Sequence, residues 1–329
     1  MNEQKVLKNM SRTVAHAYTH VKTPPVKLDL TRVALIPPSV KKVIYNTAVK
    51  FGGIFYGSFV TSSQLKNNYR KTTDFDFYLR ANKIHPFLSA LERIYGNKFT
   101  YKLNKYGVYK LIVNDLEVGD MAVFEDLTRT ANGKYVLSTA PRATTANKPY
   151  VNGNRQRSLE FETQRMIAAS AYDLKQTPDV KRTNKDVFSL GCINRALLQK
   201  MFEEYRRRPT AELNGLINKL ARDIILFSTD PKIKNLRVDF ENELIKSGMV
   251  KVRFYSPGQN AQLSALKTKL RSNTFDITKD INNVKAFEPM PVKTSKKSTN
   301  PKIKAKKRIV RKPAKKDAVL FGGGGGILW

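Results

Sequence analysis

Two aspartates one residue apart, Asp74 and Asp76, follow sixteen residues behind a Gly57-Ser58 pair. Residues 73–79 alternate polar and apolar side chains, which is the period of a half-buried strand, so both carboxylates lie on one face. Two carboxylates this close repel each other unless a cation lies between them. Paired oxygen ligands of this kind suit Mg²⁺, which usually brings substrate phosphates with it. The spacing therefore predicts a magnesium site on a strand.

The Gly57-Ser58 pair ends an apolar, strand-like run at residues 51–56. Glycine lets the backbone approach a ligand closely, and Ser58 adds a hydroxyl and amide donors where the chain turns. Such a turn predicts a phosphate cradle beside the carboxylates. The spacer that follows, residues 63–73, is long and basic, and we interpret it as a solvated loop. Three of its cations are alternative phosphate contacts: Lys66, Arg70 and Lys71.

The elements around this motif are also predicted by apolar periodicity. One helix is expected ahead of it, at residues 39–50, and an amphipathic helix behind it, at residues 84–94. Strand-like runs follow at residues 99–103, 108–113 and 116–124.

The order of apolar strand, Gly-Ser, spacer and Asp-x-Asp strand resembles the nucleotidyltransferase superfamily, whose members have a polymerase-beta-like fold. The resemblance implies an α+β fold with a small mixed β-sheet and flanking helices. It also implies a third carboxylate on a later strand, and Asp120 is the best match. Glu117 lies an odd number of residues from Asp120, so it should face the other way if that strand is regular.

A looser resemblance covers the chain that follows. Residues 159–173 have a helical pattern, and residues 181–198 are expected to form a basic turn that leads into another helix. This order is similar to the C-terminal helical part of the toxin-type, abortive-infection nucleotidyltransferases, in which a Lys-Asp pair opens a helix. Lys185 and Asp186 would be that pair here, which makes Lys185 a candidate nucleotide-binding residue.

These resemblances imply an enzyme that moves a nucleoside monophosphate from an NTP to a hydroxyl of a nucleic acid or a protein. Asp74 and Asp76 would hold two Mg²⁺ ions, with the triphosphate against Gly57 and Ser58. Asp120 would share the second ion, which activates the acceptor hydroxyl. The expected cofactor is therefore a pair of Mg²⁺ ions, and the expected substrate is an NTP.

The chain organisation is predicted from composition and pattern. In the helical part, amphipathic spacing predicts helices at 187–206 and 210–227, a strand at 249–255 and a helix at 261–270. Five segments are expected: an N-terminal arm at 1–37, a nucleotidyltransferase-like domain at 38–127, a linker or insertion at 128–157, a mostly helical domain at 158–290, and a basic, low-complexity tail at 291–329.

The net charge of +33 identifies a class of partner. Residues 293–316 hold twelve Lys or Arg and no acid, and the first 292 residues still carry 48 basic against 26 acidic side chains. A segment this basic and this poor in large apolar groups is expected to be disordered on its own and to bind nucleic acid through phosphate neutralisation. The candidate nucleic-acid-binding residues of the tail are Lys304, Lys306, Lys307, Arg308, Arg311 and Lys312.

A second function class follows from the same charge. A non-catalytic nucleic-acid-binding or packaging protein, for example in a viral particle, could reuse the nucleotidyltransferase fold. The chain ends in five glycines followed by Ile327, Leu328 and the only tryptophan, Trp329. This apolar tip on a flexible tether is a candidate docking element for a partner.

The remaining signals concern location and other metal sites. No stretch of eighteen apolar residues exists, so no membrane span is predicted. Cys192 is the only cysteine, which excludes an intrachain disulfide and favours a cytoplasmic location, in a host cell or a viral particle. His16 and His20 are four residues apart with no third ligand nearby in the sequence, so we interpret them as an exposed helical face.

Overall fold

The computed structural model describes residues 9–14, 16–17, 20, 27–104, 107–124, 127–129, 135–137, 150–151, 180–253, 257–279, 285–288 and 290–292. The chain divides into two units, Met1–Val292 and Lys293–Trp329. The predicted nucleic-acid-binding residues 304–312 and the apolar tip lie outside the described residues.

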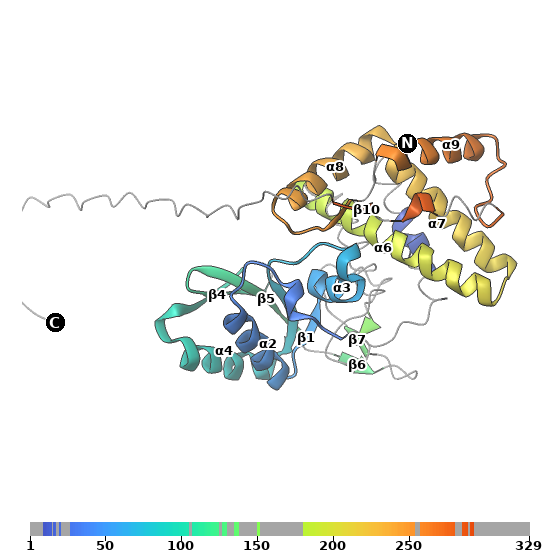
Figure 1. Cartoon of the computed structure of the whole chain (residues 1–329). Coiled ribbons are helices and arrows are strands. Elements are labelled where there is room, and N and C mark those ends of the chain that lie inside the picture. Colours follow the sequence, from blue (N-terminus) through green and yellow to red (C-terminus); the bar gives the residue numbers. More distant parts are fainter. Residues whose placement is uncertain are drawn as a thin grey trace, which may run out of the picture. The chain divides into compact units, whose positions relative to one another are not determined.

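Figure 1 labels many of the described elements, with colours that follow the sequence. The helices are α2 (Pro38–Lys50), α3 (Gly57–Leu65), α4 (Ala81–Tyr95), α6 (Val180–Arg207), α7 (Ala211–Thr229), α8 (Pro231–Lys246) and α9 (Pro257–Arg271). Short 3-10 helices are η1 (Leu30–Arg32), η2 (Lys66–Asn68) and η3 (Gly96–Lys98). The strands are β1 (Ile54–Tyr56), β2 (Phe75–Arg80), β3 (Phe99–Leu103), β4 (Val108–Val113), β5 (Leu116–Phe124), β6 (Leu127–Arg129), β7 (Tyr135–Leu137), β8 (Tyr150–Val151), β9 (Val252–Arg253) and β10 (Met290–Pro291).

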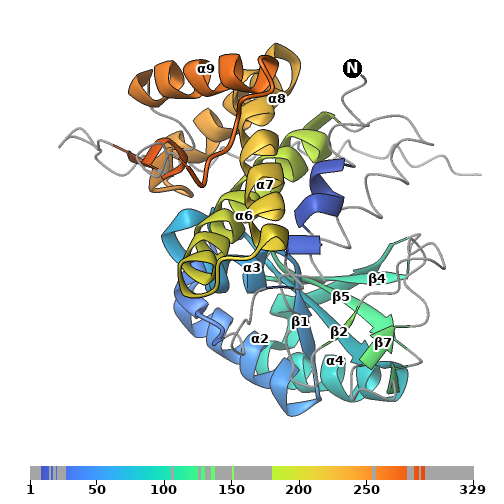
Figure 2. The same ribbon diagram turned by 90° about the vertical axis from the view of Figure 1, so that its right-hand side faces the viewer.

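Five strands form a mixed sheet in the order β1-β2-β5-β4-β3. Strands β2 and β5 are parallel, and the other neighbouring pairs are antiparallel. Helices α2 and α4 lie on one side of this sheet (Figure 2). A small mixed sheet with flanking helices was predicted, and this coarse description is confirmed.

The core of the sheet region, which we call the sheet core, is rich in aromatic side chains. Phe75, Phe77 and Leu79 alternate along β2, are fully buried, and pack with Ile44 of α2 and Phe87 of α4. Because side chains alternate across a strand, the even-numbered residues of β2 face the opposite side of the sheet. Because Phe75, Phe77 and Leu79 pack on one face of the sheet, Asp76 lies on the opposite face.

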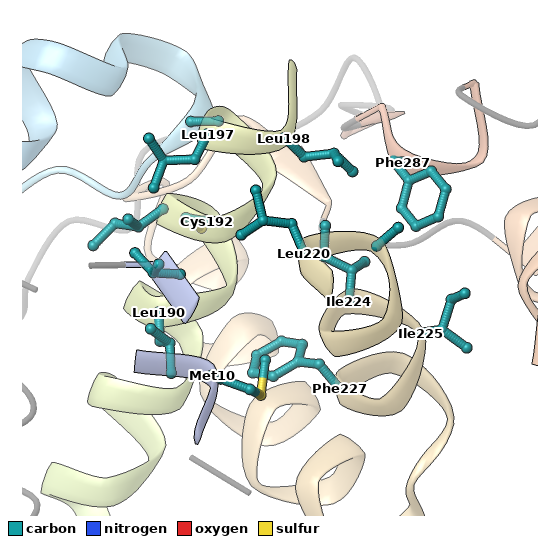
Figure 3. Packing of buried hydrophobic residues seen from close by; sticks show 14 of the residues in the cluster. Met10, Leu190, Cys192, Leu197, Leu198, Leu220, Ile224, Ile225, Phe227 and Phe287 are labelled. Atoms are coloured by element: carbon teal, nitrogen blue, oxygen red, sulfur yellow. The ribbon is translucent and has the colours of Figure 1, made fainter. Parts of the chain in front are cut away.

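A second core, the helical core, is built from α6 to α9. Amphipathic spacing on α7 buries Leu216, Leu220 and Ile224 in a single cluster with side chains of α6. Figure 3 shows these leucine- and isoleucine-rich faces together with Met10, which comes from the N-terminal residues. Helices predicted at 187–206 and 210–227 correspond to α6 and α7.

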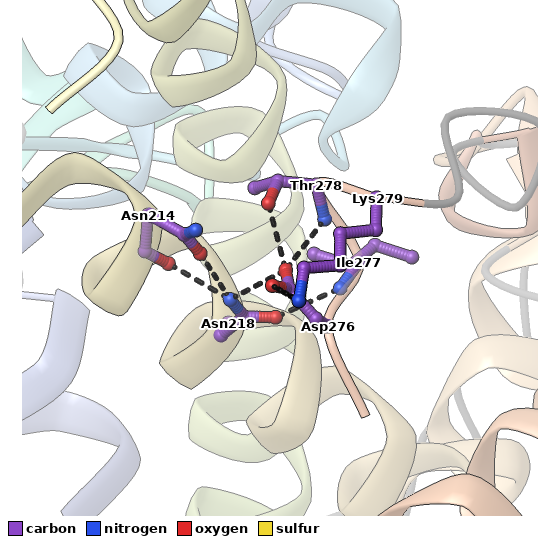
Figure 4. Close-up of polar contacts among 6 residues, drawn as sticks. All are labelled: Asn214, Asn218, Asp276, Ile277, Thr278 and Lys279. Atoms are coloured by element: carbon purple, nitrogen blue, oxygen red, sulfur yellow. Dashed lines mark hydrogen bonds and ion pairs between the residues drawn. The ribbon is translucent and has the colours of Figure 1, made fainter. Parts of the chain in front are cut away.

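Polar contacts hold the end of the helical region. Asn218 of α7 donates from Nδ2 to Asp276 Oδ1 at 3.1 Å, and its Oδ1 accepts from the Ile277 backbone N–H at 2.8 Å (Figure 4). Thr278 closes a turn by donating from its hydroxyl to Asp276 Oδ1 at 2.7 Å. The turn after α9 is thereby fixed against α7, and the Thr278 and Asn218 hydrogen bonds help to lower the pKa of Asp276 against its burial.

Several predictions of local structure need correction. Gly57 opens α3, a helix that the sequence pattern did not predict, since eight of its nine residues are buried and it has no polar stripe. The expected basic turn at residue 181 is already helical, because α6 begins at Val180. Helix α8 was not among the individually predicted elements, although it lies in the domain expected to be mostly helical. The helical pattern at 159–173 falls outside the described residues.

The spacer before the aspartates is not a solvated loop throughout. Arg32, itself only 6% exposed, donates to the backbone carbonyls of Lys66 at 2.6 Å and Tyr69 at 2.8 Å. Tyr69 and Arg70 are buried, whereas Lys66 is exposed. The spacer is therefore a folded connection, held by an arginine more than thirty residues away.

Of the helices that the structure describes, none combines the length and the apolar character needed to cross a membrane.

Candidate metal centre

Three carboxylates converge on the face of the sheet opposite α2 and α4. Asp76 of β2 and Asp120 of β5 are direct neighbours in the parallel register, and Asp74 immediately precedes β2. One carboxylate oxygen from each lies within 4.8 Å of the others, and all three residues are half-buried. The structure thus brings together the three residues that the sequence singled out as metal ligands.

Gly57 lies directly against this cluster. Its φ is +73°, and a Cβ atom placed on it would stand 2.2 Å from Asp76 Oδ2. Only glycine tolerates both the backbone conformation and this close approach. The residue also begins α3. Because Tyr56, the last residue of β1, is paired with Asp76, the first turn of α3 begins beside Asp76.

A short chain of hydroxyls positions Asp74. The Thr72 hydroxyl is 3.3 Å from Asp74 Oδ1, and the Ser58 hydroxyl is 2.8 Å from that of Thr72. Because an ionised carboxylate only accepts hydrogen bonds, Thr72 donates to Asp74 and Ser58 donates to Thr72. Thr73 also donates to Asp74 Oδ1, at 3.2 Å. The Ser58 hydroxyl thus supports Asp74, and its predicted contact with a phosphate stays a prediction.

Within this cluster, Asp120 has a raised pKa. Its Oδ1 is buried and has no hydrogen-bond partner among the described residues. Burial raises its pKa to about 6, Lys110 and Lys185 oppose the rise, and Asp74 and Glu117 add to it. A buried carboxylate oxygen without a donor is destabilised when it is ionised, and a bound cation would relieve this cost. The donor set therefore fits a hard divalent cation such as Mg²⁺.

Glu117 corrects the expectation of a regular strand. The pairing of β4 with β5 shifts between Leu111 and Ile112, so that Glu117 lies opposite Ile112 and Asp120 lies opposite Lys110. This irregularity returns Glu117 to the face of Asp120, where it forms an ion pair of 2.7 Å with the Lys110 ammonium. The Glu117 hydrogen bond is the main cause that raises the pKa of Lys110.

Lys110 is the functional candidate that the sequence analysis missed. It is the cross-strand neighbour of Asp120, and Lys102 of β3 is its neighbour in turn. Asp76, Asp120, Lys110 and Lys102 therefore form one row across four strands. The polar positions at 110 and 102 were visible in the sequence, but the register that aligns them with Asp120 was not.

Lys185 approaches the site from another element. It lies in the first part of α6 and is half-buried, and its charge lowers the pKa of Asp120. The structure thus brings this predicted nucleotide-binding residue within electrostatic range of the carboxylates. The side chain of its neighbour Asp186 is outside the described residues.

The comparisons with known proteins add no family. We found no matching protein-family model, no matching curated protein and no matching solved structure.

Proposed function

We propose that this protein is a Mg²⁺-dependent nucleotidyltransferase of the polymerase-beta-like type. The observation that supports this most is the convergence of Asp74, Asp76 and Asp120 beside Gly57, with a buried Asp120 oxygen that lacks a donor. The reaction joins an acceptor hydroxyl oxygen to the α-phosphorus of an NTP and releases pyrophosphate. Bound Mg²⁺ ions would neutralise phosphate charge and lower the pKa of the attacking hydroxyl.

Each residue has a distinct part in this proposal. Asp76 and Asp120 hold cations from adjacent strands, and the Ser58–Thr72 hydroxyls keep Asp74 oriented toward them. The first turn of α3 offers backbone N–H groups to the triphosphate, which the positive end of a helix favours. Lys110, on the strand next to Asp120, and Lys185 of α6 add positive charge near Asp120, which would attract the negatively charged phosphate oxygens.

A transfer assay tests the proposal. The full chain would be incubated with each labelled NTP, Mg²⁺ and total RNA, and label in the RNA or in the protein would be measured. Activity should require Mg²⁺ and should be lost in Asp76→Asn and Asp120→Asn. Asp115→Asn is the matched control, because Asp115 is an exposed turn residue between β4 and β5 and asparagine tolerates its φ of 61°. Transfer that survives both site variants would overturn the proposal.

A second candidate is a non-catalytic nucleic-acid-binding protein, which the net charge of +33 favours. In this case binding would need no metal and would weaken steeply with salt. We expect deletion of residues 293–329 to lower the slope of log K against log salt by roughly 2 or more, since each phosphate contact contributes about 0.9. An unchanged slope would exclude the tail as a contact. RNA binding in EDTA with no transfer under any condition would favour this candidate over the enzyme.

A further inference from the structure

The N-terminal residues are anchored in the helical core. Residues 9–14 and 16–17 are helical, and Met10, Val14 and Ala17 are at most 1% exposed. Their spacing of four and three residues makes one apolar stripe, which packs in the same cluster as α6 and α7. Figure 3 shows Met10 in this cluster, together with Leu190 and Phe227. The segment thus has a defined position beside α7.

This anchoring brings two histidines to the start of α7. The rings of His16 and His20 are 5.3 Å apart between centroids, as expected for residues one helical turn apart. The His20 backbone N–H donates to the Ala17 carbonyl at 3.1 Å, which continues the turn. Glu212 lies in the first turn of α7, two residues after the N-cap Thr210, whose hydroxyl accepts from the Leu213 N–H at 3.2 Å. His20 Nε2 is 3.5 Å from Glu212 Oε1.

The structure therefore supplies the third ligand that the sequence lacked. One ligand atom from each of His16, His20 and Glu212 lies within 4.8 Å of the others. His16 and Glu212 are exposed and His20 is half-buried, so an ion can reach the group from solvent. The interpretation of the two histidines as a bare helical face is incomplete, because residue 212 is nearly two hundred positions away in the sequence.

We propose that His16, His20 and Glu212 bind a borderline divalent transition-metal ion, Zn²⁺ being the best fit. Two imidazole nitrogens and one carboxylate oxygen, with water in the fourth position, make a tetrahedral zinc set. Imidazole selects Zn²⁺ over Mg²⁺, which prefers oxygen ligands throughout. This site therefore differs in chemistry from the carboxylate cluster of the sheet. Zn–N distances of about 2.0 Å put tetrahedral ligand atoms roughly 3.3 Å apart, so the exposed side chains need to close only slightly.

The consequence is a metal clip between the N-terminal segment and α7. A ligand that binds only the folded form stabilises it in proportion to the logarithm of its concentration over Kd. Zn²⁺ would thus hold the segment at two places, through the buried stripe of Met10, Val14 and Ala17 and through the exposed histidines.

Zinc titration of the metal-free, untagged full chain tests the proposal. Calorimetry in millimolar Mg²⁺, which competes at the carboxylate cluster, should give one Zn²⁺ per chain. At a hundredfold excess over Kd, we expect Zn²⁺ to raise Tm by roughly 5 °C or more. His16→Gln and His20→Gln should each weaken binding at least tenfold and abolish the shift. His85→Gln is the matched control, because His85 is the exposed third histidine, on α4.

Two further measurements keep the outcomes distinct. The Tm of each variant in EDTA shows whether it still folds as the wild type does. Asp76→Asn should leave Zn²⁺ binding unchanged, so failure of the nucleotidyltransferase proposal would not affect this one. If His85→Gln weakens Zn²⁺ binding as much as His16→Gln does, the proposal is overturned. The proposal would also be overturned if His20→Gln lowers Tm relative to the wild type by the same amount in Zn²⁺ and in EDTA. That result would indicate only a His20–Glu212 ion pair.

Discussion

Two half-buried aspartates, one in each region of the molecule, have the same perturbed pKa and different surroundings. Burial raises the pKa of Asp120, on the sheet, and of Asp223, on α7, to about 6 in both cases. Each has a buried carboxylate oxygen without a hydrogen-bond partner among the described residues. Asp120 lies near the carboxylates of Asp74, Asp76 and Glu117 and near Lys110. Asp223 accepts a hydrogen bond from Thr13, and the charge of Lys219 lowers its pKa.

The comparison indicates that a raised pKa alone does not make an aspartate a candidate metal ligand. Asp223 lies on α7 next to Thr13 of the N-terminal segment, and no group of possible metal ligands among the described residues includes it. Asp120 belongs to a cluster whose geometry a cation would complete. The neighbouring ionisable groups, rather than the burial, therefore distinguish Asp120 from Asp223.

The largest expected effect separates the carboxylate cluster of the sheet from Asp223 by transfer activity. Asp74→Ala and Asp76→Ala should reduce transfer by about a thousandfold or more, because each removes metal ligands worth several kcal/mol of transition-state stabilisation. Their Tm in EDTA should stay level or rise, since one of the crowded carboxylates is gone. Asp223→Asn should change transfer less than about twofold. A large loss of Tm in the site variants would indicate structural residues and erase the contrast.

Gly57 tests the close packing at the sheet site. Gly57→Ala should displace the Asp76 carboxylate, whose Oδ2 would lie 2.2 Å from the new Cβ, and should weaken Mg²⁺-dependent transfer at least tenfold. Gly52→Ala is the matched control, because its φ of +80° imposes the same backbone strain with no atom within 4 Å of the Cβ. Both variants should lose about 1–2 kcal/mol of unfolding free energy, measured by denaturant titration. Equal activity in the two would contradict a role for the contact with Asp76.

The smallest expected effect is the pH dependence of protein stability that Asp120 and Asp223 cause. Between pH 3.8 and about 6 the folded protein retains a proton on Asp120 and on Asp223 that the unfolded chain releases. Stability from these groups is therefore lost as pH rises through that window. At pH 7.5, Asp120→Asn and Asp223→Asn should each raise Tm in EDTA by roughly 1–3 °C, and the gain should vanish near pH 4.

Adding Mg²⁺ sharpens this test. The wild type and Asp223→Asn should gain Tm when Mg²⁺ is added at pH 7.5, whereas Asp120→Asn should not, because its carboxylate ligand is absent. An equal Mg²⁺ response in all three proteins would show that the ion binds elsewhere.

The elements of the sheet were the most predictable part of the fold. The expected strands at 99–103, 108–113 and 116–124 coincide with β3, β4 and β5, because each is a short run rich in apolar, β-branched and aromatic residues. Asp74, Asp76 and Asp120 were proposed from their spacing and from a resemblance, and their convergence agrees with the parallel register of β2 and β5. The local pattern was sufficient where one face of a strand packs on helices.

The missed features all depend on contacts between distant residues. Helix α3 is buried on all sides, so no periodicity marks it. The irregular pairing that returns Glu117 to the face of Asp120 depends on the register with β4. Likewise, Arg32 folds the spacer from outside it, and Glu212 meets His20 only because the N-terminal stripe packs on the helical core. Such contacts follow from tertiary packing, which a single sequence does not reveal.

Metal binding at the sheet carboxylates tests the central claim most directly. Mn²⁺, a spectroscopic substitute for Mg²⁺, would be titrated by electron paramagnetic resonance with a non-hydrolysable NTP analogue at pH 7.5. We expect two Mn²⁺ per chain in the wild type and in Asp223→Asn, and fewer than one in Asp76→Asn and Asp120→Asn. Two Mn²⁺ per chain in Asp120→Asn, or a loss in Asp223→Asn as large as in Asp120→Asn, would contradict the account.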